Sequence, residues 1–149
     1  MATRPGTHSV LLVADVQVGV VAAAWERDRI VGNVALSVRR ARESGVPVIW
    51  VQHHDGQGVS RIFLAGAATN WCVRATAYGA LDRGFDVTLL SDAHTTENIE
   101  LSPGRVVDAR SVVDDLNVAM RWLSYPGRTN AVATAAGADF ARPNHCPVR

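Results

Sequence analysis

Two side chains in this sequence have the chemistry of a nucleophile and its base. Cys72 lies in the run GAATNWCVRATA, just after an apolar segment, and Asp15 closes another apolar segment, SVLLVAD. A cysteine in the first turn of a helix feels the helix dipole, which favours the nucleophilic thiolate. The same turn offers backbone N–H groups that can hold an oxyanion, and a nearby carboxylate can take the thiol proton. The pair therefore permits attack by a cysteine on a carbonyl group.

Taken singly, each of these residues has a more common explanation. A cysteine in an apolar segment is usually a small core residue. A carboxylate that follows a strand often anchors a loop. A catalytic interpretation therefore requires a fold that brings Asp15 and Cys72 to the same edge.

The elements along the chain indicate such a fold. Apolar runs without period-two alternation predict strands that are buried on both faces. These strands are expected at 9–15, 46–53, 61–66, 85–90 and 129–135. Helical spacing of apolar residues predicts helices at 27–44, from Thr69 or Asn70 to about Arg83, and at 105–124. Strands that alternate with helices indicate an α/β fold with a parallel sheet, and ligands bind such sheets at the carboxyl ends of the strands.

The apolar faces of the helices can be predicted from the same spacing. The first helix is expected to bury Ile30, Val34, Val38 and Ala41, and the second to bury Val73, Ala77, Ala80 and Leu81. The third is expected to bury Val106, Ala109, Val113, Leu116, Met120 and Leu123. Each set recurs at three- or four-residue steps, which is typical of a helix with one buried face.

The composition excludes several classes of partner. Among 149 residues, 15 are basic and 14 acidic, a balance that argues against a nucleic-acid or membrane partner. No apolar run approaches the ~20 residues that span a bilayer, and the N-terminus lacks the apolar core of a signal peptide. A length of 149 residues fits a single domain over 1–149. The two cysteines do not make a disulfide framework, so we expect reduced thiols and a location in the cytoplasm. We expect no cofactor. No G-x-G-x-x-G follows the first strand, which argues against a nucleotide-binding domain.

One connection is too short for a regular parallel sheet. Residues 55–60, with about one more on either side, join the second expected strand to the third. A parallel crossover needs about a dozen residues or more and usually contains a helix. Eight extended residues reach ~27 Å at most, enough to return along a strand without a covering helix. Either a segment is missing or the local topology is unusual.

The whole pattern resembles the isochorismatase-like cysteine hydrolases, a group that includes nicotinamidases and N-carbamoylsarcosine amidohydrolase. The matching segments are LLVADVQVGVV at 11–21, VPVIWVQHHD at 46–55, IFLAGAATNWCVRATAYGALDRGFDVTLLSDAHTT at 62–96, and NAVATA at 130–135. They cover nearly the whole chain in the family's order. The G-x-x-T-N-x-C-V-x-x-T-A stretch within them is highly specific.

The resemblance implies a three-layer α/β fold and hydrolysis of an amide or carbamoyl C–N bond through an acyl-enzyme. Cys72 would be the nucleophile, and Asp15 the general base and acid. The N–H groups of Ala68 and Cys72 would form the oxyanion hole, and the peptide bond between Ala67 and Ala68 would be cis. The family commonly forms oligomers, so we expect a homo-oligomer.

The pocket for a small-molecule substrate is expected to include Gln17, His53, His54 and Trp71. Some nicotinamidases hold a metal ion near this place, with an Asp-x-His stretch that the run QHHD does not keep. Adjacent residues of a strand point to opposite faces, so His53 and His54 cannot easily bind one ion. We therefore expect no metal site.

The sequence departs from the family at one catalytic residue. The family triad is Asp, Lys and Cys, with the lysine between the strands that correspond here to 46–53 and 61–66. That interval is the short one, and all 15 basic residues of the chain are arginine. A missing segment that carries an edge strand, the lysine and a crossover helix explains both observations.

The loss of the lysine removes a cation whose electrostatic support is commonly worth several kcal/mol. An arginine such as Arg74 can supply charge but not a compact ammonium, and His53 or His54 could act as a substitute base. We therefore expect weak hydrolysis or none. The alternative is an inactive relative that binds a ligand or oligomerises through the same surface.

Overall fold

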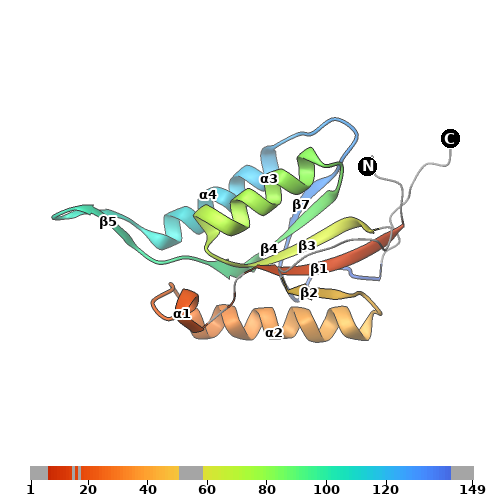
Figure 1. The fold of residues 1–149 in the computed structure, drawn as a ribbon, viewed down its shortest axis with the longest axis horizontal. Helices are drawn as coiled ribbons and strands as arrows, with labels where there is room; N and C mark the ends of the chain where they lie inside the picture. The colour runs from red at the N-terminus through yellow and green to blue at the C-terminus, as the bar shows by residue number, and fades with distance from the viewer. Residues whose placement is uncertain (1–6, 15, 17, 51–58, 142–149) are drawn as a thin grey trace.

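A computed structural model describes residues 7–14, 16, 18–50 and 59–141. Its centre is a parallel sheet with the strand order β2-β1-β3-β4-β7 (Figure 1). The strands are β1 (His8–Ala14), β2 (Val48–Trp50), β3 (Val59–Ala67), β4 (Asp86–Thr95) and β7 (Asn130–Ala133). Each neighbouring pair is parallel, which confirms the α/β class with a parallel sheet.

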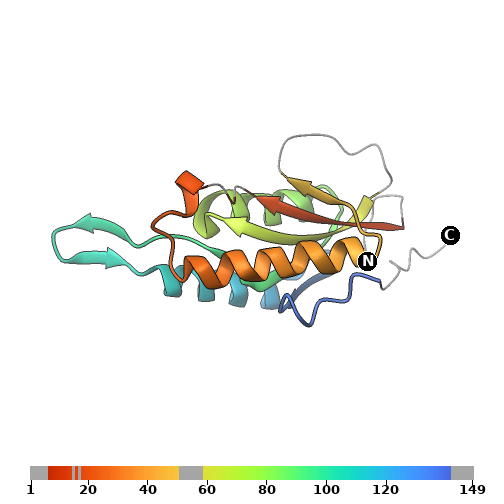
Figure 2. The same cartoon turned by 90° about the horizontal axis from the view of Figure 1, so that it is seen from below.

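Helices cover both faces of this sheet. They are α1 (Val18–Val21), α2 (Arg27–Glu43), the π-helical turn η1 (Thr69–Val73), α3 (Arg74–Asp82) and α4 (Ala109–Trp122). α2 runs along one face, and α3 and α4 lie on the other (Figures 1 and 2). Within the described ranges, no helix is both long enough and apolar enough to cross a membrane.

The core forms two layers, one on each side of the sheet. Leu64 and Leu89 of the sheet pack with Leu81 and Leu116 of the helices on one side. On the other side, Leu11, Val13 and Phe63 pack with residues of α2, including Ile30. Because successive strand residues point to opposite faces, both faces of β1 and β3 must be apolar. The prediction of strands buried on both faces is confirmed for β1, β3 and β4. It is wrong for the edge strands: β7 is only partly buried, and Trp50 of β2 is 51% exposed.

The predicted faces of the first two helices are also confirmed. Both sets of four residues named for these helices are buried. α2 ends where predicted, with Ser44 as its C-cap and Gly45 at φ 68°, a left-handed conformation that suits glycine.

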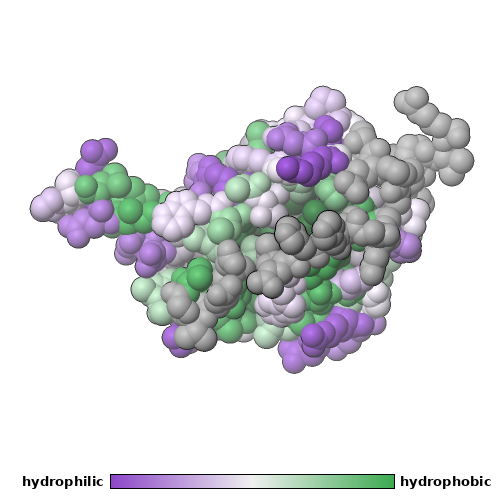
Figure 3. Space-filling model, in the orientation of Figure 1, coloured by the Kyte–Doolittle hydropathy of each residue, from purple (hydrophilic) through white to green (hydrophobic). Residues whose placement is uncertain are grey.

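The predicted start of the third helix is wrong. Residues 105–107 form β6 (Arg105–Val107), which pairs antiparallel with β5 (Ile99–Ser102). The two strands form a hairpin that projects from the rest of the molecule (Figures 1 and 2). In the space-filling view it is the protruding part at the left (Figure 3). A Pro-Gly turn between β-branched residues is the signal that favours this hairpin over a helix.

α4 begins at Ala109 because Asp108 caps it. The Asp108 side chain accepts a hydrogen bond of 2.8 Å from the Ser111 N–H, an N-cap interaction that also lowers the pKa of this carboxyl. Val106 and Leu123, expected to face inward, lie outside α4: Val106 is in β6 and Leu123 is the C-cap, and they are exposed at 54% and 37%. The other four residues predicted for this face are buried.

Two strands differ in length from their predictions. β4 continues to Thr95, beyond the predicted end at residue 90, and this extension carries His94 to the carboxyl end of the sheet. β2 is described only over Val48–Trp50, at the edge of the sheet. β2 and β3 lie on opposite sides of β1, and residues 51–58, which connect them, lie outside the described ranges.

Candidate active site

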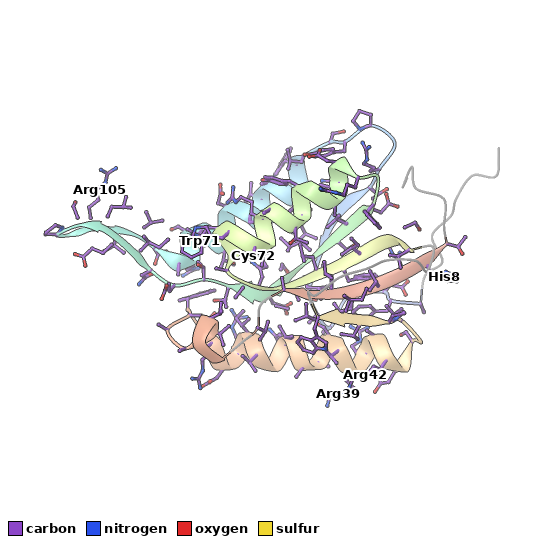
Figure 4. All side chains as sticks on the ribbon, viewed as in Figure 1. His8, Arg39, Arg42, Trp71, Cys72 and Arg105 are labelled. Atoms are coloured by element: carbon purple, nitrogen blue, oxygen red, sulfur yellow. The ribbon has the colours of Figure 1, made fainter. Side chains whose placement is uncertain are left out.

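A cleft of about 320 Å³ contains Cys72 in its wall. Its lining comes from the α1 region, from the turn after β3 and from the segment after β4: Val20, Ala22, Ala23, Ala68, Trp71, Cys72, Thr96, Glu97 and Ile99. Figure 4 shows Cys72 at the end of the sheet opposite His8, the first residue of β1. The cleft therefore opens at the carboxyl end of the strands, where ligands of such folds bind.

The turn that carries Cys72 is wider than an α-helical turn. The Ala68 carbonyl accepts hydrogen bonds from the N–H groups of Trp71 at 3.1 Å and Val73 at 3.2 Å, and the second closes a five-residue π turn. The peptide bond between Ala67 and Ala68 is cis, at the position that the resemblance implies. Cys72 is exposed, so its thiol is accessible from solvent.

Neither of the predicted N-caps, Thr69 and Asn70, caps this turn with its side chain. The turn has no side-chain cap hydrogen bond. The Thr69 hydroxyl oxygen lies instead 2.9 Å from His94 Nδ1, and Asn70 Oδ1 accepts a hydrogen bond of 2.8 Å from the Thr96 hydroxyl. Tertiary partners on and after β4 therefore take the groups that local sequence assigned to capping.

A glycine aligns the ends of β1 and β3 beside the cleft. Gly66 pairs with Ala14, the last residue of β1, and has φ 135°, a backbone conformation that side chains rarely allow. A Cβ at Gly66 would overlap the carbonyl group of Ala14. Only glycine lets the two strands approach this closely, two residues before Ala68 enters the cleft.

The end of β4 also fixes the opposite wall. The Thr95 hydroxyl donates a hydrogen bond of 2.7 Å to the Trp25 carbonyl, and the Trp25 N–H donates one of 2.8 Å to the Thr96 carbonyl. Ala22 and Ala23, which line the cleft, lie in the same short connection between α1 and α2. Both walls of the cleft are therefore attached to one strand end.

His94 is buried beneath this strand end. Its Nε2 lies 3.1 Å from Asn117 Oδ1 on α4. Burial lowers the pKa of His94 to about 4, although the Asn117 hydrogen bond and the charges of Asp92 and Asp114 act in the opposite direction. The imidazole is therefore neutral at pH 7.

Glu97 is the one charged residue among those that line the cleft in the described ranges. Arg74, the cation nearest to Cys72 in sequence, faces elsewhere: its guanidinium donates to the Asp115 carboxylate on α4 at 2.5 Å. The structure therefore does not bring Arg74 into the cleft as a substitute for a lysine. The remaining described lining is largely apolar, with Trp71 as its aromatic residue.

The structure brings together some of the predicted site residues. Cys72, Ala68 and Trp71 line one cleft, while Ala67 is buried in β3. Asp15, Gln17, His53 and His54 lie outside the described residues, so their roles stay predictions. In the described part of the chain, no group of three His, Cys, Asp or Glu residues could hold a metal ion.

Other residues of the site were not predicted from the sequence. The run DAHTTEN at 92–98 supplies Thr96 and Glu97 to the cleft, and His94 and Thr95 to the hydrogen bonds beneath and beside it. Its signal is a cluster of polar residues directly after an apolar strand. Such a cluster marks the carboxyl edge of a parallel sheet, where sites form.

Comparison with known proteins gives a family match and a fold match. The family model of the isochorismatase domain matches residues 9–57 and 55–103, and no curated protein matches the sequence. An isochorismatase from Pseudomonas putida has a similar structure, with a TM-score of 0.69 and 19% identity over 89% of this chain and 91% of that one.

Two further solved structures are similar. A cysteine hydrolase from Pseudomonas syringae pv. phaseolicola has a TM-score of 0.68 and 16% identity, over 87% of this chain and 89% of that one. An isochorismatase family protein from Burkholderia thailandensis has a TM-score of 0.60 and 18% identity, over 90% of this chain and 96% of that one. At this level of identity the structural likeness shows a shared fold: a parallel sheet flanked by helices.

Proposed function

Because the chain belongs to the isochorismatase domain family, we propose that it is a hydrolase that cleaves the C–N bond of a small amide or carbamoyl compound, with Cys72 as its nucleophile. The observation that carries this proposal is the position of Cys72. It is exposed, in the wall of a cleft, in the first turn after a central strand. This position combines access for a substrate with the electrostatic field of a helix start.

The proposed reaction has two steps. The Cys72 thiolate attacks the carbonyl carbon, and the N–H groups of Ala68 and Cys72 donate hydrogen bonds to the oxyanion. The C–N bond then breaks, and ammonia or an amine leaves with a proton from Asp15, which has taken the thiol proton. Water attacks the thioester, releases the carboxylic or carbamic acid and restores the thiol.

The lining of the cleft favours a small substrate that is neutral or cationic. A volume of about 320 Å³ is at the lower end of the ~300–1,000 Å³ found for ligand pockets. Glu97 would repel a substrate carboxylate, while Trp71 offers an aromatic face to an apolar or cationic group. Amides without a carboxylate therefore fit better than dianions.

We further propose that the reaction is slow, because the chain contains no lysine to support the thiolate and the base. The two segments of the family match meet at 55–57, in the short connection between β2 and β3, which supports the absence of a family segment there. Removal of an active-site cation commonly costs several kcal/mol of transition-state stabilisation.

The test is ammonia release from neutral, cationic and anionic primary amides of similar size, followed with the wild type and with Cys72→Ala. We expect slow turnover of neutral and cationic amides, abolished in Cys72→Ala, and a thioester on Cys72 detectable by mass spectrometry. Glu97→Gln serves as the matched charge control, and it should reduce the preference for cationic amides. Turnover that persists in Cys72→Ala would contradict the mechanism.

An inactive relative that associates through its surface is the second candidate, and one observation favours it. The β5–β6 hairpin exposes Leu101 and Val106 at 56% and 54%, and a hairpin without packing partners is marginally stable in water. A homo-oligomer would cover this apolar surface. Light scattering with the wild type and with Leu101→Ser tests it, since the substitution should shift the oligomer toward the monomer.

A further inference from the structure

A buried histidine beneath the Cys72 turn connects this turn to β4 and α4. His94 and Thr69 are both 0% exposed. His94 Nδ1 lies 2.9 Å from the Thr69 hydroxyl oxygen, and His94 Nε2 lies 3.1 Å from Asn117 Oδ1. No step of the proposed reaction uses this imidazole, and His94 is not among the residues that line the cleft.

The neighbouring hydrogen bonds fix the position of the imidazole proton. Asn117 Nδ2 donates to the Ser91 carbonyl at 3.2 Å, so the amide turns its oxygen, Oδ1, toward His94. That oxygen only accepts, and His94 must therefore carry its proton on Nε2. Nδ1 of the neutral ring is then an acceptor, and the Thr69 hydroxyl donates to it.

The surroundings keep the ring in this neutral form. The groups that act on it are Asn117 and Asp114 from α4 and Asp92 from β4, all of which favour the imidazolium. Asp92 Oδ1 accepts a hydrogen bond of 2.7 Å from the Ala135 N–H. The effect of burial is larger than all three, and the pKa of His94 falls to about 4.

We propose that His94 is a positioning residue for the nucleophile: through Nδ1 it holds the Thr69 hydroxyl, and thereby the π turn that carries Cys72. This inference rests on the proposed function of Cys72 as the nucleophile. Thr69 is the first residue of the turn, and Cys72 follows three residues later. With the bond from Thr96 to Asn70, this contact attaches consecutive residues of the turn to the end of β4.

The charge state of His94 decides the direction of the hydrogen bond between His94 Nδ1 and the Thr69 hydroxyl. The neutral ring accepts the Thr69 proton, whereas an imidazolium would present an N–H to the same hydroxyl and reverse the bond. The Asn117 amide, fixed by the Ser91 carbonyl, selects the required tautomer. The turn is therefore held in one geometry as long as the ring is neutral.

The first arm of the test is NMR of the wild-type protein with ¹⁵N-labelled histidine. Two-bond ¹H–¹⁵N correlations distinguish the Nε2–H tautomer from the Nδ1–H tautomer. We expect His94 to show the Nε2–H tautomer at pH 7 and no protonation down to about pH 5. The Nδ1–H tautomer, or an imidazolium at pH 7, would overturn the proposal.

The second arm measures the alkylation rate of Cys72 by iodoacetamide against pH, in a Cys146→Ser background. Thr69→Ser keeps the hydroxyl, whereas Thr69→Val keeps the shape and removes it. We expect the rate at pH 7 to stay within about twofold in Thr69→Ser and to fall about tenfold in Thr69→Val, as the apparent thiol pKa rises toward the ~8.5 of an ordinary cysteine. Equal profiles for the two variants would overturn the proposal.

The two proposals fail in different ways. A wild-type profile with the pKa of an ordinary cysteine would contradict the proposed function, and with it the positioning role. A lowered wild-type pKa that is unchanged in Thr69→Val would contradict the role of His94 alone. If Thr69→Val does not fold, the NMR arm still decides the tautomer on which the role depends.

Discussion

The central strands of the sheet and its β2 edge differ in how firmly they are held. The centre consists of the long strands β3 and β4, all of whose residues are buried or partly buried, and β3 leads into the Cys72 turn. Hydrogen bonds join the end of β4 to both walls of the cleft. The edge strand β2 is three residues long, and its Trp50 is 51% exposed. β7, the opposite edge strand, packs instead against α4.

Of the proposed catalytic groups, the cysteine nucleophile lies at the centre of the sheet, and the lysine of the family would lie at the β2 edge. The scaffold of the nucleophile depends on β1, β3, β4 and α4, all of which the structure describes. The lysine of the family would follow β2, at the edge where the chain continues with only eight residues, 51–58, before β3 begins. If the chain lacks the lysine segment, as proposed, the hydrogen bonds that hold the Cys72 turn are still present. Substitutions in the centre of the sheet should therefore lower the free energy of unfolding more than substitutions at the β2 edge.

The largest loss is expected at Gly66, where β1 and β3 meet beside the cleft. A Cβ there would overlap the Ala14 carbonyl, and φ 135° strains any other residue. Gly66→Ala should lower the free energy of unfolding by on the order of 4 kcal/mol or prevent folding. Urea denaturation followed by circular dichroism measures it.

Gly32→Ala is the matched control, since a Cβ at this exposed position of α2 meets nothing within 4 Å. It should stabilise the protein by about 0.5–1 kcal/mol, because alanine favours a helix. Similar losses for the two variants would contradict the close approach of β1 and β3.

A slightly smaller loss is expected for Leu64→Ala in the middle of β3. Leu64 is 0% exposed and belongs to the core between the sheet and the helices α3 and α4. Truncation should cost about 3 kcal/mol, from lost burial and the cavity left behind. A cost below about 1 kcal/mol in urea denaturation would mean that this core is not closely packed.

Acid should lower the free energy of unfolding of the protein through His94. Its pKa is about 4 in the folded protein, below the 6.5 of an ordinary histidine. Between these values the unfolded chain binds a proton that the folded protein does not, so stability falls as the pH decreases from about 6.5 to about 4. The loss should total about 2–3 kcal/mol.

Chemical denaturation at several pH values, with the wild type and with His94→Gln, gives the free energy of unfolding against pH. The difference between the slopes of the two curves measures the contribution of His94. The variant lacks the titrating group, so its stability should fall less over the same range. Parallel curves would show that His94 is not buried in its neutral form.

Sequence predicted the scaffold well because its signals are local. β1 and β3 are uninterrupted apolar runs, and α2 repeats apolar residues at helical steps until Gly45 ends it. These patterns follow from burial on two faces or on one, so they can be recognised without knowing which distant segments complete the core. The position of Cys72 after a central strand was predictable for the same reason.

The interactions that shape the site were not predictable, because they join distant segments. Thr69 and Asn70 have the side chains of N-caps, but His94 and Thr96 bind their oxygens. The hairpin at 99–107 replaced the first turn of a predicted helix, since Asp108 caps α4 later than the apolar spacing implies. Which partner a polar side chain finds depends on the fold, and local sequence patterns do not show it.

The smallest loss is expected at the edge, for Trp50→Thr. The indole is half exposed on a three-residue strand and lines a shallow apolar groove with Val31 and Val34 of α2. Its replacement removes little buried area, and threonine suits an edge strand, so the free energy of unfolding should fall by about 1 kcal/mol or less.

The same Trp50→Thr variant should also leave the alkylation profile of Cys72 unchanged. The side-chain hydrogen bonds described for the Cys72 turn run to the end of β4 and on to α4, whereas β2 pairs with β1 at the edge of the sheet. A loss as large as that of Leu64→Ala would mean that the edge is as tightly packed as the centre. A changed Cys72 profile would mean that the centre of the sheet and its β2 edge are coupled, so that the cysteine depends on the edge at which the family segment is proposed to be missing.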